Sequence, residues 1–166
     1  MNYFFLDASA VVKRYIPETG TFEMNYFFAS VPPHRMLCLF EGGGEVVFVF
    51  SRSRNQRKVT ATRFNQIKQR FLTEVIYRVR VVKVFPTKNQ IRLSWDFIER
   101  YSINSTDAIL LQCALDRVNE LRIEGDNLVL VSADKRLLNA ARSEGLLTFN
   151  PETDNQAALD ILINPP

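Results

Sequence analysis

The chain has 166 residues, 46% of them hydrophobic, and its 21 basic and 18 acidic side chains give a net charge of +3. This length suits one domain with a single buried core, and the apolar share argues against a disordered chain. The apolar stretch at residues 1–7 lacks a basic leader and is too short for a signal peptide or a membrane span, so we expect a cytoplasmic protein. Cys38 and Cys113 both stand in apolar runs, which predicts buried thiols and argues against a metal site built on cysteine.

The charges are distributed unevenly. Residues 52–92 hold 12 Lys or Arg and one acid, Glu74, a net charge of +11, while the other 9 basic and 17 acidic residues give −8. A stretch of this kind can neutralise phosphates. A solvated helical face is the alternative interpretation. The first interpretation predicts phosphate contacts by a group of four side chains: Arg52, Arg54, Arg57 and Lys58.

Apolar runs and helix-like spacings alternate along the chain. In chain order we expect a strand at 3–6, helices at 8–16 and 19–30, a strand at 36–40, a helix at 62–77, a strand at 79–85, helices ending at 101 and at 121, a strand at 128–132, a helix at 134–144 and a strand at 146–149. Apolar strands without polar alternation are buried on both faces. The sequence therefore predicts an α/β fold, a three-layer α/β/α sandwich with a mainly parallel sheet. We expect one domain at 1–151 and a C-terminal tail at 152–166.

Helix starts and one ambiguous stretch complete the secondary-structure prediction. Thr19 or Thr21 can cap the second helix, Thr87 or Asn89 the helix ending at 101, and Ser105 or Thr106 the next one. Residues 46–50 are β-branched and aromatic, which favours a strand. Their position after the glycines at 42–44 also suits a helix.

Four acids stand near the ends of expected elements. Asp7 follows the first strand directly, Asp134 lies two residues past the strand at 128–132, Glu45 comes shortly after the strand at 36–40, and Asp107 opens a helix. The functional crevice of an open α/β sheet lies beyond the carboxyl ends of its strands. Clustered carboxylates repel one another unless a cation neutralises them, and oxygen ligands suit Mg²⁺ or Mn²⁺.

Each acid also has a structural explanation. Asp7, Asp107 and Asp134 are favourable residues for helix N-termini, and Glu45 alone would be an ordinary surface side chain. The combination of the four in this order is much more specific than any one of them.

The same residues carry a resemblance to a known family. The opening Phe5-Leu6-Asp7-Ala8-Ser9-Ala10-Val11-Val12-Lys13-Arg14-Tyr15 resembles the start of PIN-domain proteins, especially the VapC-type toxins of bacterial toxin–antitoxin pairs. Glu45-Val46-Val47 resembles the family's second acidic motif. Thr106-Asp107-Ala108-Ile109-Leu110-Leu111 and Leu130-Val131-Ser132-Ala133-Asp134-Lys135-Arg136-Leu137-Leu138 resemble the third and fourth.

The resemblance implies a PIN-like fold and a metal-dependent endoribonuclease, the toxin of a toxin–antitoxin pair. By motif match, the catalytic metal ligands would be Asp7, Glu45, Asp107 and Asp134, supported by Ser9 and Ser132. It further implies Mg²⁺ or Mn²⁺ as cofactor, RNA as substrate, a cognate antitoxin as partner and a homodimer. Arg52, Arg54, Arg57 and Lys58 would then be the RNA-binding residues.

The second motif departs from the family pattern. Gly42-Gly43-Gly44 precedes Glu45, and Phe48 and Phe50 stand where smaller helix formers are usual. Glu41 is therefore the alternative second ligand. The resemblance favours a helix for residues 46–50.

Other functions remain open on the sequence alone. A PIN-like RNA-processing nuclease without an antitoxin would carry the same motifs. A non-catalytic PIN-like module that binds RNA or a partner is disfavoured by the complete set of four acids. The glycines at 42–44 lack the spacing of P-loop and dinucleotide-binding motifs, and Ser9 stands where a dehalogenase-like phosphatase needs its second Asp.

Overall fold

The structure is a computed structural model that describes residues 1–165, and its centre is a five-stranded sheet. The strand order is β3-β2-β1-β4-β5, and every neighbouring pair is parallel. The strands are β1 (Asn2–Leu6), β2 (Met36–Leu39), β3 (Val82–Val84), β4 (Asn127–Val131) and β5 (Leu147–Phe149). The parallel α/β architecture is therefore confirmed.

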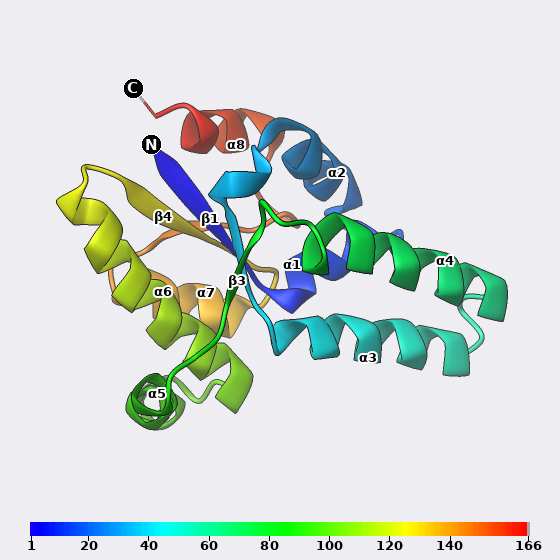
Figure 1. The fold of residues 1–166 in the computed structure, drawn as a ribbon, viewed down its shortest axis with the longest axis horizontal. Helices are drawn as coiled ribbons and strands as arrows, with labels where there is room; N and C mark the ends of the chain where they lie inside the picture. Colours follow the sequence, from blue (N-terminus) through cyan, green and yellow to red (C-terminus); the bar gives the residue numbers. More distant parts are fainter. Residues whose placement is uncertain (166) are drawn as a thin grey trace.

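Helices cover both faces of this sheet (Figure 1). The α-helices are α1 (Ala8–Val12), α2 (Thr21–Ser30), α3 (Gly42–Asn55), α4 (Ala61–Phe71), α5 (Lys88–Tyr101), α6 (Ser105–Ile123), α7 (Lys135–Ser143) and α8 (Gln156–Ile163). A 3-10 turn, η1 (Pro33–Arg35), precedes β2, and a π-helical segment, η2 (Leu72–Ile76), continues α4.

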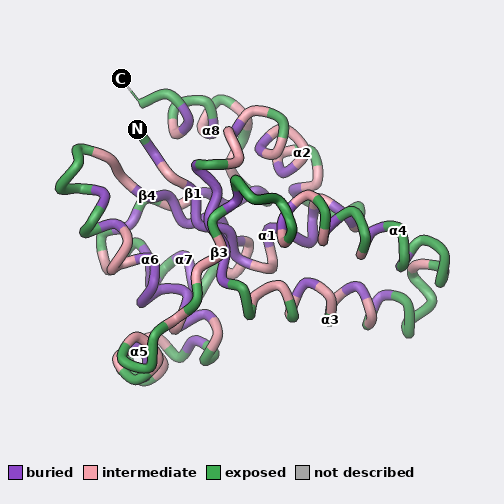
Figure 2. The backbone as a smooth tube through the Cα atoms, in the orientation of Figure 1, coloured by how far each residue is buried: buried purple, intermediate pink, exposed green. Residues whose placement is uncertain are grey.

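The core has two halves, one on each face of the sheet. Phe4 and Leu6 of β1 pack with residues of α1, α2, α3, α4 and α8. Phe5, between them, points to the other face and packs with residues of α5, α6 and α7. Because successive strand side chains point to opposite faces, the apolar end of β1, residues 4–6, is buried on both sides (Figure 2). The three-layer sandwich expected from the sequence is thereby confirmed.

The ambiguous stretch at 46–50 is helical. It lies within α3, which starts at the first of the three glycines. Val46 and Phe50, four residues apart, are buried in the core, where Phe50 packs against Tyr15 and Phe71, whereas Phe48 is 64% exposed. This spacing of buried residues is helical, so the strand favoured by propensity was wrong and the helix implied by the resemblance is confirmed. Helices α3 and α4 form a hairpin that projects from the sheet (Figure 1).

The start of α2 differs from both caps expected from the sequence. Its N-cap is Gly20, in the left-handed region with φ of 89°. A Cβ on Gly20 would stand 2.8 Å from the carbonyl oxygen of Pro151, so a larger side chain does not fit there. Thr21 instead accepts a hydrogen bond from the N–H of Glu18 at 2.9 Å. The preceding helix, α1, is also shorter than expected and ends at Val12.

Four further features of the structure differ from the secondary structure expected from the sequence. The expected helix at 62–77 is α4 followed by η2, and the expected strand at 79–85 shrinks to β3, an edge strand paired only with β2. Asn104 caps α6 in place of Ser105 or Thr106. The expected C-terminal tail contains α8, whose Leu159 is fully buried in the core. No helix within residues 1–165 combines the length and apolar character needed to cross a bilayer.

Candidate active site

The strand order reverses between β1 and β4, and this is where the acidic residues gather. β2 and β3 lie on one side of β1, whereas β4 and β5 lie on the other. Leu6 at the end of β1 pairs with Val131 at the end of β4, and the N–H of Asp7 donates to the carbonyl oxygen of Val131 at 2.9 Å. In open parallel sheets such a reversal leaves a crevice at the carboxyl ends of the strands.

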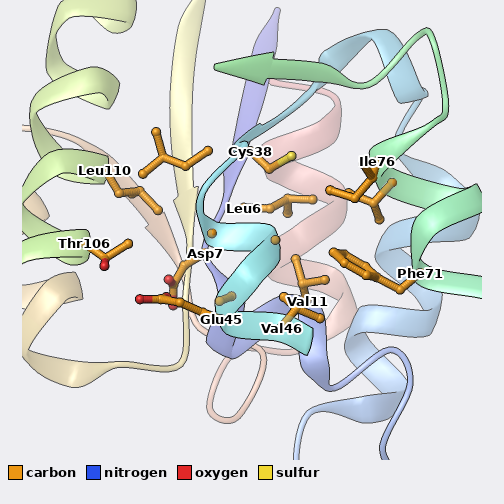
Figure 3. A pocket seen from close by; sticks show the side chains of 15 residues that line it. Leu6, Asp7, Val11, Cys38, Glu45, Val46, Phe71, Ile76, Thr106 and Leu110 are labelled. Atoms are coloured by element: carbon orange, nitrogen blue, oxygen red, sulfur yellow. The ribbon is translucent and has the colours of Figure 1, made fainter. Parts of the chain in front are cut away.

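One recess at this edge holds all four acids of the sequence prediction. We call it the acidic recess; its walls include Asp7, Glu45, Asp107 and Asp134, together with Phe48 and Asn104. They come from the ends of β1 and β4 and the first turns of α3 and α6. The Asp7 and Glu45 carboxylates lie near one another, with Thr106 of α6 opposite (Figure 3). Glu41 is exposed and does not line the recess, so the geometry favours Glu45 over Glu41 as the second acid.

Asp7 is the most buried of the four and is held by two serines. Its Oδ2 accepts from the Ser9 hydroxyl, from the Ser9 N–H at 3.2 Å and from the Ser132 hydroxyl at 2.9 Å. The Ser9 hydroxyl also accepts a hydrogen bond from the N–H of Ala133 at 2.9 Å, and the Ser132 hydroxyl accepts one from the N–H of Asp134 at 3.0 Å. Burial raises the pKa of Asp7, while the serine hydrogen bonds lower it. The two serines thus tie the start of α1 to the segment after β4.

Asp107 shows that the four acids interact. Burial is the main cause that raises its pKa, and the negative charges of Asp7, Asp134 and Glu45 add to it, so that the pKa reaches about 7. Asn104 holds it in place by donating Nδ2–H to Oδ2 at 2.8 Å and accepting the Asp107 N–H at 2.9 Å. A cation in the recess would relieve this repulsion.

Asp134 has the helix-capping role that the sequence allowed. Its Oδ1 accepts the N–H groups of Arg136 and Leu137, at 2.7 and 3.1 Å, which leaves Oδ2 outside these bonds. Glu45 lies in the first turn of α3, and its carboxylate takes part in none of the side-chain hydrogen bonds or ion pairs of the described residues. Capping and ligation are therefore compatible at Asp134, because they use different oxygens.

The donor set fits a hard divalent ion. It consists of carboxylate oxygens, which Mg²⁺ and Mn²⁺ prefer, and its mutual repulsion is the electrostatic condition that such an ion neutralises. Within residues 1–165, no three Asp, Glu, His or Cys side chains already stand in a metal-binding arrangement.

An apolar cavity adjoins the acidic recess, and Asp7 and Glu45 line both (Figure 3). Its other walls include Cys38, Phe71 and Leu110. Burial raises the pKa of the Cys38 thiol to about 11, so Cys38 is an apolar wall residue and not a nucleophile. This side of the recess is lined mainly by apolar side chains, and such low-dielectric surroundings strengthen electrostatic interactions at the carboxylates.

The four basic residues expected to bind RNA lie at the outer end of α3 and in the turn after it, and all are exposed. They do not share one face. Arg52 follows Glu45 by seven residues, about two turns, and so lies on the same side of α3. Arg54 follows Glu45 by nine residues, about two and a half turns, and its guanidinium instead lies 4.6 Å from the ring centre of Phe64 on α4.

Phe48, Asn104 and Arg136 act at the recess and were absent from the predicted site. Phe48 and Asn104 line it, and the positive charge of Arg136 lowers the pKa of Asp107. The sequence held signals for two of them. Asn104 starts the polar turn before Asp107, and Arg136 lies two residues after Asp134. Phe48 could be placed only once residues 46–50 were known to be helical.

Comparison with known proteins supports the fold. No protein-family model matches the sequence, and no curated protein matches it. Solved structures do match: FitAcB from Neisseria gonorrhoeae has a TM-score of 0.60 at 13% identity, covering 91% of this chain and 99% of that chain. VapC20 from Mycobacterium tuberculosis, a toxin that cleaves the sarcin–ricin loop, has a TM-score of 0.57 at 15% identity. The match covers 82% of this chain and 94% of VapC20. PAE2754 from Pyrobaculum aerophilum has a TM-score of 0.55 at 14% identity, and the match covers 91% of this chain and 90% of PAE2754.

Proposed function

We propose that this chain, which has the PIN-like α/β fold that its motifs implied, is a divalent-metal-dependent endoribonuclease, the toxin of a toxin–antitoxin pair. One observation carries the proposal: four carboxylates from separate elements line one recess, where burial and the charges of the other three raise the pKa of Asp107. A fold that keeps four repelling carboxylates together needs a function for them, and cation binding provides it.

Asp7, Glu45, Asp107 and Asp134 are the residues that would hold Mg²⁺ or Mn²⁺. The bound ion supplies water activation and charge stabilisation at a phosphate under attack. The chain's own residues prepare this site. Ser9 and Ser132 orient Asp7 and favour its ionised form by donating to Oδ2, and Asn104 orients Asp107. The arrangement suits hydrolysis of RNA phosphodiester bonds.

The toxin role rests on likeness to VapC20, itself a toxin that cleaves RNA. A toxin of this kind requires a partner that blocks its site, so we propose a cognate antitoxin and, from the family resemblance, a homodimer. A small protein encoded beside this chain that binds it and stops cleavage would support the toxin role. Cleavage by the chain with no such partner would favour an RNA-processing nuclease.

The direct test is cleavage of structured and unstructured RNAs by the purified chain, with Mg²⁺, with Mn²⁺ and with EDTA. We expect cleavage with either ion and none with EDTA. Asp7→Asn should be inactive, whereas Asp96→Asn, which removes an exposed carboxylate on α5, should cleave normally. Cleavage that survives EDTA and Asp7→Asn would refute the metal mechanism. A wild type that leaves every RNA intact with both ions would refute the ribonuclease.

A further inference from the structure

Phe48 has an unusual position for a large apolar side chain. It is 64% exposed, and it lines the acidic recess together with all four carboxylates. Single exposed apolar residues are common on protein surfaces, so exposure alone means little. A wide aromatic side chain on the wall of a charged recess does require an explanation.

The ring of Phe48 is free of partners. Within residues 1–165 it takes part in no aromatic pair and no cation–π contact. By contrast, the exposed rings of Phe40 and Phe85 stack on each other with centres 4.9 Å apart, and Phe50 packs against Tyr15 and Phe71. Phe48 is thus a flat apolar face open to a ligand.

Helix α3 places this ring between the acids and a cation. Glu45, Phe48 and Arg52 are spaced by three and four residues and so share one side of α3. Glu45 faces the recess, and Arg52 is exposed and forms no ion pair within the described residues. This side of α3 therefore presents in order a carboxylate, an aromatic ring and a guanidinium, with about 10 Å of helix between the first and the last.

The guanidinium and the ring match two parts of an unpaired nucleotide strand, its phosphates and its bases. Phosphates interact with cations, and the π-faces of unstacked bases stack on aromatic side chains whatever the base. Resting on the proposed ribonuclease function, we propose that Phe48 is the stacking platform for a base beside the cleaved phosphate, and that the substrate is therefore RNA unpaired at that point. A base within a duplex already stacks on its neighbours and offers no free face to Phe48.

The inference is tested with Phe48→Leu, which keeps an apolar side chain and removes the aromatic face, and with Phe48→Trp, which restores one. Phe22→Leu is the matched control, because Phe22 is 69% exposed on α2 and does not line the recess. Since both Phe side chains are exposed, all three variants should fold and melt as the wild type does.

Two readouts separate stacking from structure. In cleavage of a single-stranded RNA, Phe48→Leu should raise KM by about 5- to 100-fold with kcat little changed, since stacking affects bound substrate and transition state alike. In binding, an RNA carrying 2-aminopurine should lose fluorescence on Asp7→Asn protein, which leaves the RNA intact. That loss should vanish with Phe48→Leu added and return with Phe48→Trp.

The outcomes distinguish the two proposals. If the wild type cleaves RNA and Phe48→Leu keeps both its KM and the quenching, the ribonuclease stands and the stacking role is refuted. Equally efficient cleavage of duplex and single-stranded RNA would refute the stacking role as well. If the wild type neither binds nor cleaves RNA, the proposed function itself is wrong.

Discussion

The Ser132 hydroxyl donates a 2.9 Å hydrogen bond to Oδ2 of Asp7, a residue 125 positions earlier in the chain. This bond joins the segments that follow β4 and β1, at the point where the sheet order reverses. It stabilises the ionised form of a carboxyl whose pKa burial raises. The orientation and charge of the most buried acid thus depend on a residue from the other half of the fold.

Removing that donor should change the pH profile of cleavage. In Ser132→Ala, Asp7 loses a hydrogen bond that lowers its pKa, so we expect the acidic limb of kcat/KM to move to higher pH. Activity near neutral pH should fall by about 10- to 100-fold, as is typical when a partner of a metal ligand is lost. Ser143→Ala, at an exposed position in the last turn of α7, is the control. An unshifted profile in Ser132→Ala would show that this bond does not tune Asp7.

Replacing the acids should separate catalysis from folding. We expect Asp7→Asn, Asp107→Asn and Asp134→Asn each to lower cleavage by at least about a hundredfold, because the ion loses a ligand. Asn also caps helices well, so α7 should persist in Asp134→Asn. The measurement is single-turnover cleavage together with circular dichroism. A variant that unfolds early yet cleaves normally per folded molecule would identify its acid as a helix cap only.

Asp107 gives a stability prediction with a definite sign. Its pKa is 3.8 as a free side chain and about 7 in the folded chain, so the folded state binds more protons between these values. The free energy of unfolding of the metal-free protein should therefore fall as pH rises from about 4 through 7. Asp107→Asn has no such titration. In EDTA its melting temperature should exceed that of the wild type by more at pH 8 than at pH 4, and an equal difference at both would contradict the assignment.

The second acid can be settled by a pair of substitutions. Glu45 lines the recess, whereas Glu41 is exposed at the N-cap of α3. Glu45→Gln should abolish cleavage, and Glu41→Gln should leave most of it. Measuring metal affinity by calorimetry on both variants checks that the loss comes from ligation. The opposite pattern would mean that the start of α3 rearranges when metal binds.

The sequence predicted the sheet and the acidic cluster because both depend on local signals. Apolar runs such as 128–131 give strands, and an acid directly after a parallel strand lies at the functional edge. The sequence prediction failed where contacts between distant residues determine the local structure. Gly20 caps α2 because the Pro151 carbonyl leaves no room for a Cβ, and these residues are 131 positions apart. Propensity favoured a strand at 46–50, but burial of Val46 and Phe50 in the core stabilises a helix there.

The helical phase of α3 also sharpens the prediction for the basic residues. If the bound RNA strand follows the side of α3 that carries Glu45 and Phe48, Arg52 contacts a phosphate and Arg54 does not. RNA affinity should fall with salt, with a log–log slope of about −0.7 for each phosphate contacted on a single strand. Arg52→Ser should flatten the slope by about that amount and weaken all RNAs alike, since phosphate contacts carry no sequence information.

Arg54→Ser is the matched control for Arg52→Ser, because it removes the same charge from the opposite side of the helix. It should keep the wild-type slope and cost only a little stability through the lost contact with Phe64. Replacing Arg52, Arg54, Arg57 and Lys58 together by Ser measures the contribution of the whole cluster. If even this variant keeps the wild-type slope, the cluster does not contact RNA. Binding of an acidic antitoxin segment, or solvation alone, would then be the better account of its charge.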